Sequence, residues 1–204
     1  MSNPFIKYPL LLMMGLTLWL QAAALAPSLF SHKGLALAEA KFEFKAHTEV
    51  LVHKLAGPYA AMVVKAAKAA RPLPPALLHA SFGVQLPSYL VLARLAAAVV
   101  QVESSARRHI AVSKAGAIGP MQLMPHTAWK VLSVNPWKPE QNIKGGTRYL
   151  AKLLRRYKSV PKALAAYNAG PTRIAKPGPL PLETRHYVKK VMRLADLEQI
   201  ADAQ

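Results

Sequence analysis

Glu103 is the residue whose type and setting most favour chemistry. It is the only carboxylate between Val50 and Pro139, and it ends a nearly apolar run that begins at Leu95. A carboxyl group buried in such a setting without partners raises its pKa until it keeps its proton. Because a carboxylic acid that is protonated near neutral pH can donate its proton to a substrate, Glu103 is a candidate general acid.

A structural interpretation of Glu103 is also open. The acid could simply end a buried helix and pair with Arg107 or Arg108 about one turn further on. Ion pairs of this kind shift the pKa of an acid without any catalytic role. Glu103 alone does not distinguish the two interpretations, so the rest of the sequence is needed to choose between them.

The elements that must position Glu103 are predicted to be helices. The segment from Ser88 to Ser104 is apolar on nearly every side, which is typical of a central helix. Further helices are expected over 39–70 with a break at Gly57-Pro58, and over 121–131, 142–157, 163–169 and 182–203. No alternating strand pattern persists, so the fold class is predicted to be mainly α.

The N-terminus predicts export. Residues 1–9 carry Lys7 and no acid, residues 10–30 are mostly apolar, and Ala36-Leu37-Ala38 precedes Glu39. This order describes a secretory signal peptide over 1–38, and an uncleaved membrane anchor through 10–30 is the alternative. Residues 39–85 are expected to form a basic helical extension that ends in a proline-rich break, and residues 86–204 a second domain. The predicted location is therefore the periplasm or cell envelope.

Composition limits the chemistry and the partners. The 204 residues include 27 Lys and Arg against 9 Asp and Glu, a formal charge of +18, which favours anionic partners. The absence of cysteine excludes disulfides, a thiol nucleophile and zinc–cysteine sites. The seven histidines show no metal-binding spacing, so no metal and no cofactor are expected.

Four blocks in order make the sequence resemble the SLT domain of soluble lytic transglycosylases, which is lysozyme-like and related to goose-type lysozyme. The blocks are Glu103-Ser104, the glycine-containing segment 113–125, Tyr167-Asn168-Ala169-Gly170 and the segment 183–188. The resemblance covers residues 86–194. Four blocks in the right order are far more specific than any one of them.

The resemblance implies cleavage of the β-1,4 bond between N-acetylmuramic acid and N-acetylglucosamine in peptidoglycan, with a 1,6-anhydromuramyl product. By match, Glu103 is the general acid and then the general base. The resemblance places Gln122 and Met124 along the sugar groove and Tyr167 beside the acid, and it gives Ser113 a contact with the site. Asn168 joins the substrate-binding candidates, although it is also expected to shape its turn.

The number of carboxylates agrees with this interpretation. A typical glycosidase uses two, whereas here Glu140 and Glu183 are the only internal candidates for a second one. Glu183 is expected to be an acid at a helix start, where the helix dipole favours it. A reaction in which the muramyl 6-hydroxyl is the nucleophile needs only one carboxylate.

Two departures from the family pattern concern the substrate contacts. Pro120 stands where the family usually has Leu, and the aromatic residue that the family often has directly after the Glu-Ser pair is missing. Both departures leave Glu103 unchanged.

Three alternatives remain: a lysozyme-type hydrolase on the same fold, a non-catalytic wall-binding component of a secretion or conjugation apparatus, and a nucleic-acid binder. Only the net charge supports the last, and no recognition motif does, so nucleic acid is not an expected partner. The expected partners are peptidoglycan glycan strands, with envelope-spanning machinery as a further candidate.

Overall fold

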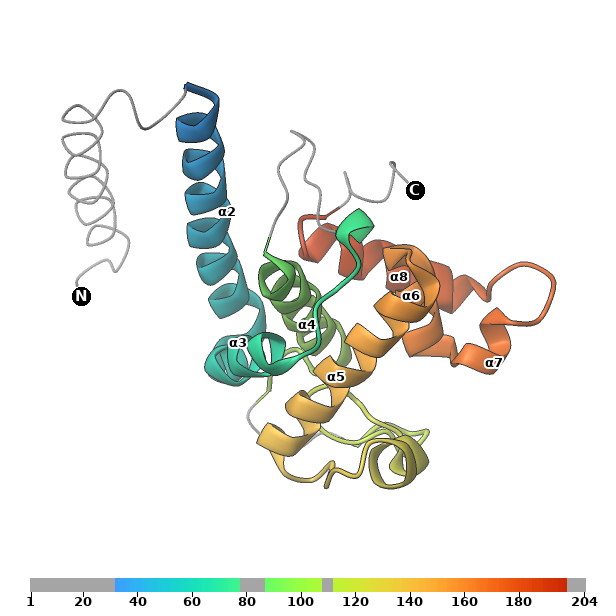
Figure 1. The fold of residues 1–204 in the computed structure, drawn as a ribbon. Coiled ribbons are helices and arrows are strands. Elements are labelled where there is room, and N and C mark those ends of the chain that lie inside the picture. The colour runs from blue at the N-terminus through green and yellow to red at the C-terminus, as the bar shows by residue number, and fades with distance from the viewer. Residues whose placement is uncertain (1–31, 78–86, 108–111, 198–204) are drawn as a thin grey trace. The chain divides into compact units, whose positions relative to one another are not determined.

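Residues 32–77, 87–107 and 112–197 are described by the computed structural model of the chain. The chain divides into two units, Met1–Phe42 and Glu43–Gln204, and all the site candidates belong to the second. The elements are α2 (His32–Ala56), η2 (Gly57–Tyr59), α3 (Ala60–Ala69), η3 (Pro75–Leu77), α4 (Ser88–Ser104), η4 (Thr127–Val131), α5 (Pro139–Tyr157), α6 (Val160–Ala169), α7 (Pro171–Ile174) and α8 (Leu182–Leu194) (Figure 1).

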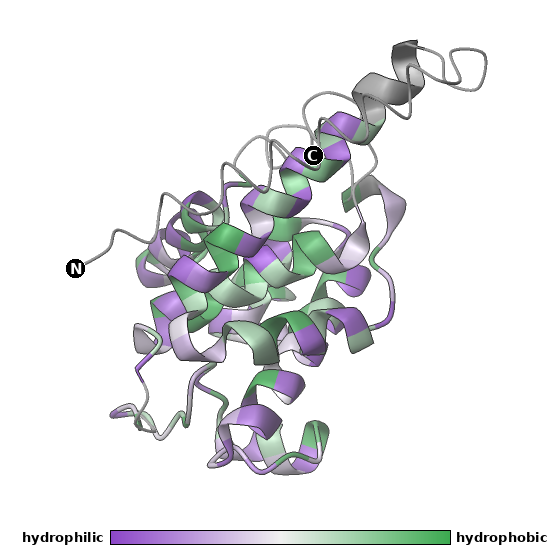
Figure 2. Cartoon of the chain, turned by 90° about the vertical axis from the view of Figure 1, so that its left-hand side faces the viewer, coloured by the Kyte–Doolittle hydropathy of each residue, from purple (hydrophilic) through white to green (hydrophobic). Residues whose placement is uncertain are grey.

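The predicted mainly α class is confirmed. Every element of the described residues is helical, and extended structure there is limited to the isolated bridges Val112–Ile118 and Ile118–Leu123. In Figure 2 most of the helices carry both hydrophobic and hydrophilic residues along the ribbon, as is expected of helices that bury one side.

Helix α4 is the centre of the second unit. Every residue from Leu90 to Val100 is buried, and α3, α5 and α8 all pack against it. A helix that is apolar all round is stable only when neighbours cover it on every side. Its bounds agree with the prediction, and it ends where Ser105 and Ala106 take left-handed backbone conformations with φ of 54° and 51°. Glu103 therefore lies in the last turn of the most buried helix.

Helices α5 and α8 pack on α4, and α6 packs in turn on these two helices. Helix α6 ends at Gly170, whose φ of 86° is one that glycine adopts without strain. Helix α8 is shorter than predicted, because the chain leaves the helix after Leu194. Asp196 has a φ of 53°, and the buried Leu197 donates its amide to the Met192 carbonyl. The predicted part beyond residue 197 lies outside the described residues.

The segment between α4 and α5 differs from the prediction. A helix is expected over 121–131, but residues 113–124 form turns and isolated bridges, and helical structure begins only at Pro125 and continues as η4. Gln122 has a φ of 46° and donates its amide to Gly119, while Ile118 and Leu123 exchange backbone hydrogen bonds. Pro125 has no amide to donate and its ring clashes with a preceding helical turn, so it is accommodated at the first helical position and not inside a helix.

The part of the predicted N-terminal extension that lies in the second unit packs closely on the rest of it. The break at Gly57-Pro58 is confirmed as η2, and α3 packs against α4 and α5. Beyond α3, the Leu73 amide donates to the Ser88 hydroxyl at 2.8 Å, and Arg155 donates to the Arg71 carbonyl at 3.1 Å. The domain boundary at 85/86 stays a prediction, because residues 78–86 lie outside the described residues.

The described helices include none that combines the length and the apolar character needed to cross a bilayer. The predicted anchor at 10–30 lies outside the described residues.

Candidate active site

Glu103 has the pKa that its sequence setting predicts. Burial is the main cause that raises the pKa of this partly exposed carboxyl from 4.5 to about 7. The negative charge of Glu183 raises it further, whereas an interaction with the Tyr187 hydroxyl lowers it. At neutral pH the Glu103 carboxyl is therefore protonated in a large fraction of the protein molecules, as a general acid requires.

The ion pair of the structural interpretation is not formed in the described part of the chain. No described Lys or Arg lies within ion-pair distance of Glu103, and Arg107 is exposed just beyond the left-handed turn at the end of α4. Arg108 lies outside the described residues. Burial therefore acts on Glu103 without a compensating cation among these residues.

Tyr187 is the hydroxyl group that interacts with Glu103. It lies on the inner side of α8, only 7% exposed, and burial followed by the charge of Glu103 raises its pKa well above the ordinary value. Its hydroxyl has no partner at normal hydrogen-bond geometry among the described residues. The Tyr187 hydroxyl and the Glu103 carboxyl are therefore close in space. Their interaction favours the ionised carboxylate, although the two groups do not have the geometry of a hydrogen bond.

Tyr167 lies near Glu103 but is bonded elsewhere. Its hydroxyl donates to the Met121 carbonyl at 2.9 Å, and its ring lies 5.7 Å from the ring of Tyr149. Burial raises the pKa of Tyr167 well above the ordinary value, and the charge of Glu103 is the second cause. The predicted neighbour of the acid therefore holds the backbone of the glycine-containing loop.

Asn142 fixes that loop, and sequence reasoning missed it. This fully buried side chain of α5 accepts from the Met121 amide at 2.9 Å and donates to the carbonyls of Ile118 at 2.7 Å and Pro136 at 3.1 Å. Gly119 passes so close that a Cβ atom there would lie 2.4 Å from the Asn142 amide nitrogen. The only signal in the sequence is an asparagine at the start of a predicted amphipathic helix, and an asparagine at such a position is usually exposed to solvent.

Ser104 joins the same loop to α4. The Oγ atom of this buried serine lies 3.0 Å from both the Val100 and the Pro120 carbonyl oxygens, so its single hydrogen is shared between them. The family departure at Pro120 therefore keeps this contact, because a proline still offers its carbonyl. The residue next to the acid thus fixes the loop that faces it.

The other predicted site residues lie on the loop and on α6. Met124 is 46% exposed and free to contact a ligand. The Gln122 side chain donates to the Gly119 carbonyl at 2.9 Å. Ser113 is exposed, and its hydroxyl accepts from the Ala117 amide at 3.0 Å. Asn168 accepts from the Thr184 hydroxyl at 2.9 Å, which joins α6 to the first turn of α8.

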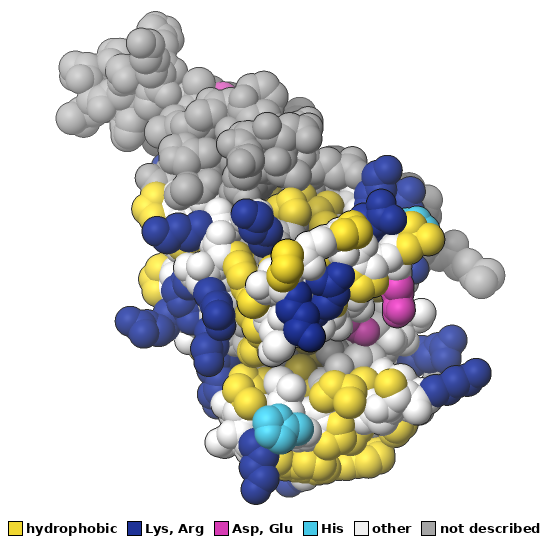
Figure 3. Space-filling model, turned by 90° about the vertical axis from the view of Figure 1, so that its right-hand side faces the viewer, with side chains coloured by type: hydrophobic (Ala, Val, Ile, Leu, Met, Phe, Trp, Pro, Cys, Tyr) yellow, Lys and Arg dark blue, Asp and Glu magenta, His cyan; other side chains and the backbone are white. Residues whose placement is uncertain are grey.

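Glu103 and Glu183 come from distant parts of the chain but lie near each other. Glu183, which was expected to serve mainly as a helix-start acid, is exposed on α8 and close enough for its charge to raise the pKa of Glu103. Figure 3 shows one face of the molecule hollowed between surfaces rich in hydrophobic and basic side chains, with acidic side chains at the hollow. The described residues contain no cluster of three or more His, Asp or Glu that could hold a metal.

The comparisons with known proteins agree on one family. The family model described as "Transglycosylase SLT domain" matches residues 83–180. A transglycosylase of Enterobacteria phage PRD1 is 41% identical over 117 residues, which are 57% of this chain and 42% of the phage protein. The membrane-bound lytic murein transglycosylase F of Pseudoalteromonas translucida is 45% identical over 67 residues, 29% of this chain and 14% of that protein.

Solved structures of two lytic transglycosylases are also similar. The 70 kDa soluble enzyme of Escherichia coli has 30% identity and a TM-score of 0.45, over 60% of this chain and 23% of that one. An inactive mutant of Slt from Pseudomonas aeruginosa has 26% identity and a TM-score of 0.47, over 70% and 24%. The chain thus spans less than half the length of each of these four relatives. The predicted SLT resemblance is confirmed, and α8, which carries Glu183 and Tyr187, lies beyond the residues matched by the family model.

Proposed function

We propose that this chain, whose residues 83–180 match the transglycosylase SLT domain family, is a peptidoglycan lytic transglycosylase. It would cleave the β-1,4 bond between N-acetylmuramic acid and N-acetylglucosamine and leave a 1,6-anhydromuramyl end. The observation that carries this proposal is Glu103, a partly exposed acid with a pKa of about 7 and no described cationic partner. The relatives named as transglycosylases support the reaction class.

The proposed reaction uses Glu103 twice. Protonated Glu103 gives its proton to the glycosidic oxygen as the bond from that oxygen to the muramyl C1 breaks. The muramyl 6-hydroxyl oxygen then bonds to C1, and the Glu103 carboxylate accepts the hydroxyl proton. The acid is regenerated, and no water is consumed. A pKa near the working pH serves both steps.

The loop and the neighbouring tyrosines would orient this chemistry. Met124, which is 46% exposed, is proposed to contact a sugar face, and Gln122 to offer polar contacts at the groove. Ser113 is proposed to bind substrate from the turn that its hydroxyl stabilises. Tyr167 and Asn168 are proposed to act at the same site, the first from its place near Glu103 and the second from the junction of α6 and α8.

The test of the acid is Glu103→Gln, which keeps the shape of the side chain and removes its titratable proton. We expect the release of muropeptides from sacculi to fall by about 10²–10⁴-fold, the usual contribution of a general acid. Glu140→Gln is the matched control, because Glu140 is an exposed acid that only pairs with Lys65 at 3.2 Å. An unchanged rate of wall lysis in the Glu103 variant would favour the non-catalytic wall-binding alternative.

A second candidate function is hydrolysis, because Glu183 lies close enough to Glu103 to change its pKa. A second carboxylate could activate water in place of the sugar hydroxyl. Mass spectrometry of digested sacculi separates the two: anhydro ends support the transglycosylase, and reducing ends support the hydrolase. Loss of reducing ends in Glu183→Gln would assign the second carboxylate to that reaction.

The proposed place of action is the cell envelope, reached through the signal peptide over 1–38. Fractionation of cells that produce the full chain tests it, and a fully cytosolic protein would contradict it. Membrane association through 10–30 and a partnership with secretion or conjugation machinery stay predictions.

A further inference from the structure

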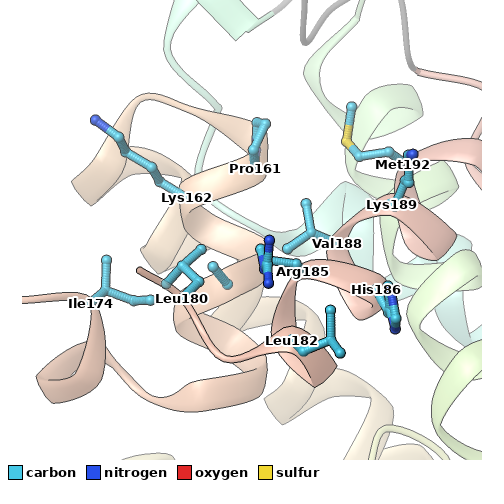
Figure 4. A pocket seen from close by; sticks show the side chains of 11 residues that line it. Pro161, Lys162, Ile174, Leu180, Leu182, Arg185, His186, Val188, Lys189 and Met192 are labelled. Carbon is cyan, nitrogen blue, oxygen red and sulfur yellow. The ribbon is translucent and has the colours of Figure 1, made fainter. Parts of the chain in front are cut away.

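A second concave site lies on the outer side of α8. It is a groove of about 840 Å³ between α6, α7 and α8, and aliphatic side chains such as Ala165, Val188 and Met192 form much of its lining. Four basic side chains stand around it: Lys162, Arg185, His186 and Lys189. In Figure 4, Arg185 lies between Leu180 and Val188, while Lys162 projects from α6 on one side and Lys189 and His186 lie on α8 on the other.

This groove is separate from the surroundings of Glu103. Glu183 and Tyr187, which act on Glu103, are four residues apart and therefore share one side of α8. Arg185, Lys189 and Met192 lie on the opposite side at about 100° per residue. A ligand in the groove would therefore not displace a sugar that is bound at Glu103.

The wall of the groove is held by the segment after α7. Arg173 donates to the Pro179 carbonyl at 2.6 Å, which closes the segment between Ile174 and Leu180, both of which line the groove. A wall fixed in this way loses little conformational freedom when a ligand binds.

The charge of the groove selects the kind of ligand. His186 and Lys189 also line a neighbouring hollow of about 300 Å³ that is completed by Lys190 and Arg193, so the two hollows adjoin along α8. No acid is present among the described residues that line either one. An anionic ligand with small apolar groups complements this surface, since its charges meet the basic rim and its methyl groups the aliphatic floor.

Other anionic ligands fit the groove less well. The described lining contains no Trp, Tyr or Phe, so it offers no face on which a sugar ring or a nucleic-acid base can stack. A bilayer surface is flat and cannot fill a concave groove. A short peptide that carries carboxylates and alanine-like methyl groups matches both the shape and the charge.

We propose that this groove binds the acidic stem peptides of peptidoglycan, an inference that rests on the proposed function. A stem peptide carries several carboxylates and small side chains. Arg185 pairs with one carboxylate in the two-pronged geometry that guanidinium groups favour, and Lys189 with another. The enzyme would thus hold peptide-bearing strands through a contact that takes no part in the chemistry at Glu103.

The direct test is titration of the intact protein with a free stem tetrapeptide that carries no sugar. We expect saturable binding, and Arg185→Glu with Lys189→Glu should weaken it by about tenfold or more, because each change replaces a favourable charge by a repulsive one. The control is Lys144→Glu with Lys152→Glu, the same charge change at two exposed positions of α5. Thermal unfolding of each variant shows that it is folded.

The second arm compares sacculi with glycan strands from which an amidase has removed the stems. The wild-type protein should cleave both, with a lower KM on the strands that carry stems. The groove variant should lose this preference and keep its kcat. Cleavage of neither substrate by the wild-type protein would refute the proposed function, whereas the peptide titration is read independently of cleavage.

Two results would overturn the inference. One is tetrapeptide affinity that is equal in the groove variant, the control variant and the wild-type protein. The other is a groove that binds anionic lipid vesicles and ignores the peptide, which would assign it to a membrane surface.

Discussion

Three effects of unequal size set the proton affinity of Glu103. Burial raises the pKa most, the Tyr187 hydroxyl opposes it, and the charge of Glu183 adds to it, with a result of about 7. Only the first effect is local in the sequence. The other two come from α8, which is some eighty residues away along the chain, and they make the pKa sensitive to side chains that the acid's own helix does not contain.

The two neighbours on α8 should move the pH profile in opposite directions. Tyr187→Phe removes a group that favours the carboxylate, so the pKa of Glu103 rises and the alkaline limb of kcat/KM against pH shifts upward. Glu183→Gln removes a negative charge, so the pKa falls and the same limb shifts downward. Shifts of the same sign in both variants would contradict this account.

Burial of Glu103 also predicts a cost in stability that depends on pH. Below pH 4.5 the acid is protonated in both the folded and the unfolded state, and it costs nothing. Between pH 4.5 and 7 the unfolded state releases its proton first, so stability falls by about 3 kcal/mol in total, and above pH 7 it stays level.

Glu103→Gln should therefore unfold at a higher temperature than the wild-type protein at pH 8 and at nearly the same temperature at pH 4. Thermal unfolding followed by circular dichroism at the two pH values measures this. Glu140→Gln is the control, because it removes an exposed acid on another helix. Equal unfolding temperatures of the Glu103 variant and the wild-type protein at pH 8 would mean that the acid is not buried as described.

Some of this site could be predicted at the level of single residues. The raised pKa of Glu103 follows from the apolar run before it, because burial depends on the helix that carries the acid. The interaction with Tyr187 could not be predicted in this way. Nothing in the sequence says which turn of a C-terminal helix meets the end of a central one, and Tyr167 was the phenol expected at that place. The three hydrogen bonds of Asn142 were equally hidden, since its partners are backbone atoms of a distant loop.

At the scale of elements, the glycine-containing loop depends on α5. Asn142 supplies its hydrogen bonds, while Gly146 leaves room for Met121, whose Sδ would lie 2.6 Å from a Cβ there. Helix α4 has its predicted bounds because its apolar run is long enough for a helix that neighbours cover on every side, and Pro87 precedes it while Ser105 leaves the helical conformation. The loop differs from its predicted helix because its backbone groups bond across its own tight turns and to the side chains of Asn142, Ser104 and Tyr167, so they are not available for a helical ladder.

Two glycines of this loop allow a controlled test of that dependence. Both Gly116 and Gly119 have positive φ, 83° and 81°, but a Cβ at Gly116 meets nothing within 4 Å, whereas one at Gly119 would lie 2.4 Å from the Asn142 amide nitrogen. Gly116→Ala should therefore cost about 1 kcal/mol from backbone strain alone. Gly119→Ala should cost about 3 kcal/mol or more, because it also displaces Asn142.

Urea unfolding of the two variants measures the difference, and wall lysis should fall far more in the Gly119 variant. Equal losses of stability would show that the contact with Asn142 contributes little.

At the scale of the molecule, the residues before the SLT match complete the second unit. Arg94, buried in α4, donates to the Thr48 hydroxyl at 2.8 Å and lies 3.9 Å from the centre of the Phe44 ring. It also pairs with Asp196 at 3.3 Å, and burial lowers its pKa while Asp196 raises it. The Tyr59 hydroxyl donates to the Arg107 carbonyl at 2.6 Å, just beyond Glu103. Helix α2 thus provides a hydrogen-bond partner for the buried Arg94 guanidinium, and η2 holds the backbone at Arg107, which follows Glu103.

A chain that begins at residue 86 should therefore be much less stable than one that begins at residue 43. The shorter chain loses α3, whose Val63 and Ala67 are buried, and leaves Arg94 with Asp196 as its main partner. A buried charge that loses partners costs about 3 kcal/mol or more, a large part of the stability of a domain. Urea unfolding followed by circular dichroism should show a cooperative transition for 43–204 and a lower midpoint, or none, for 86–204. Equal midpoints would make residues 43–85 a true appendage, with the fold complete from residue 86 onward.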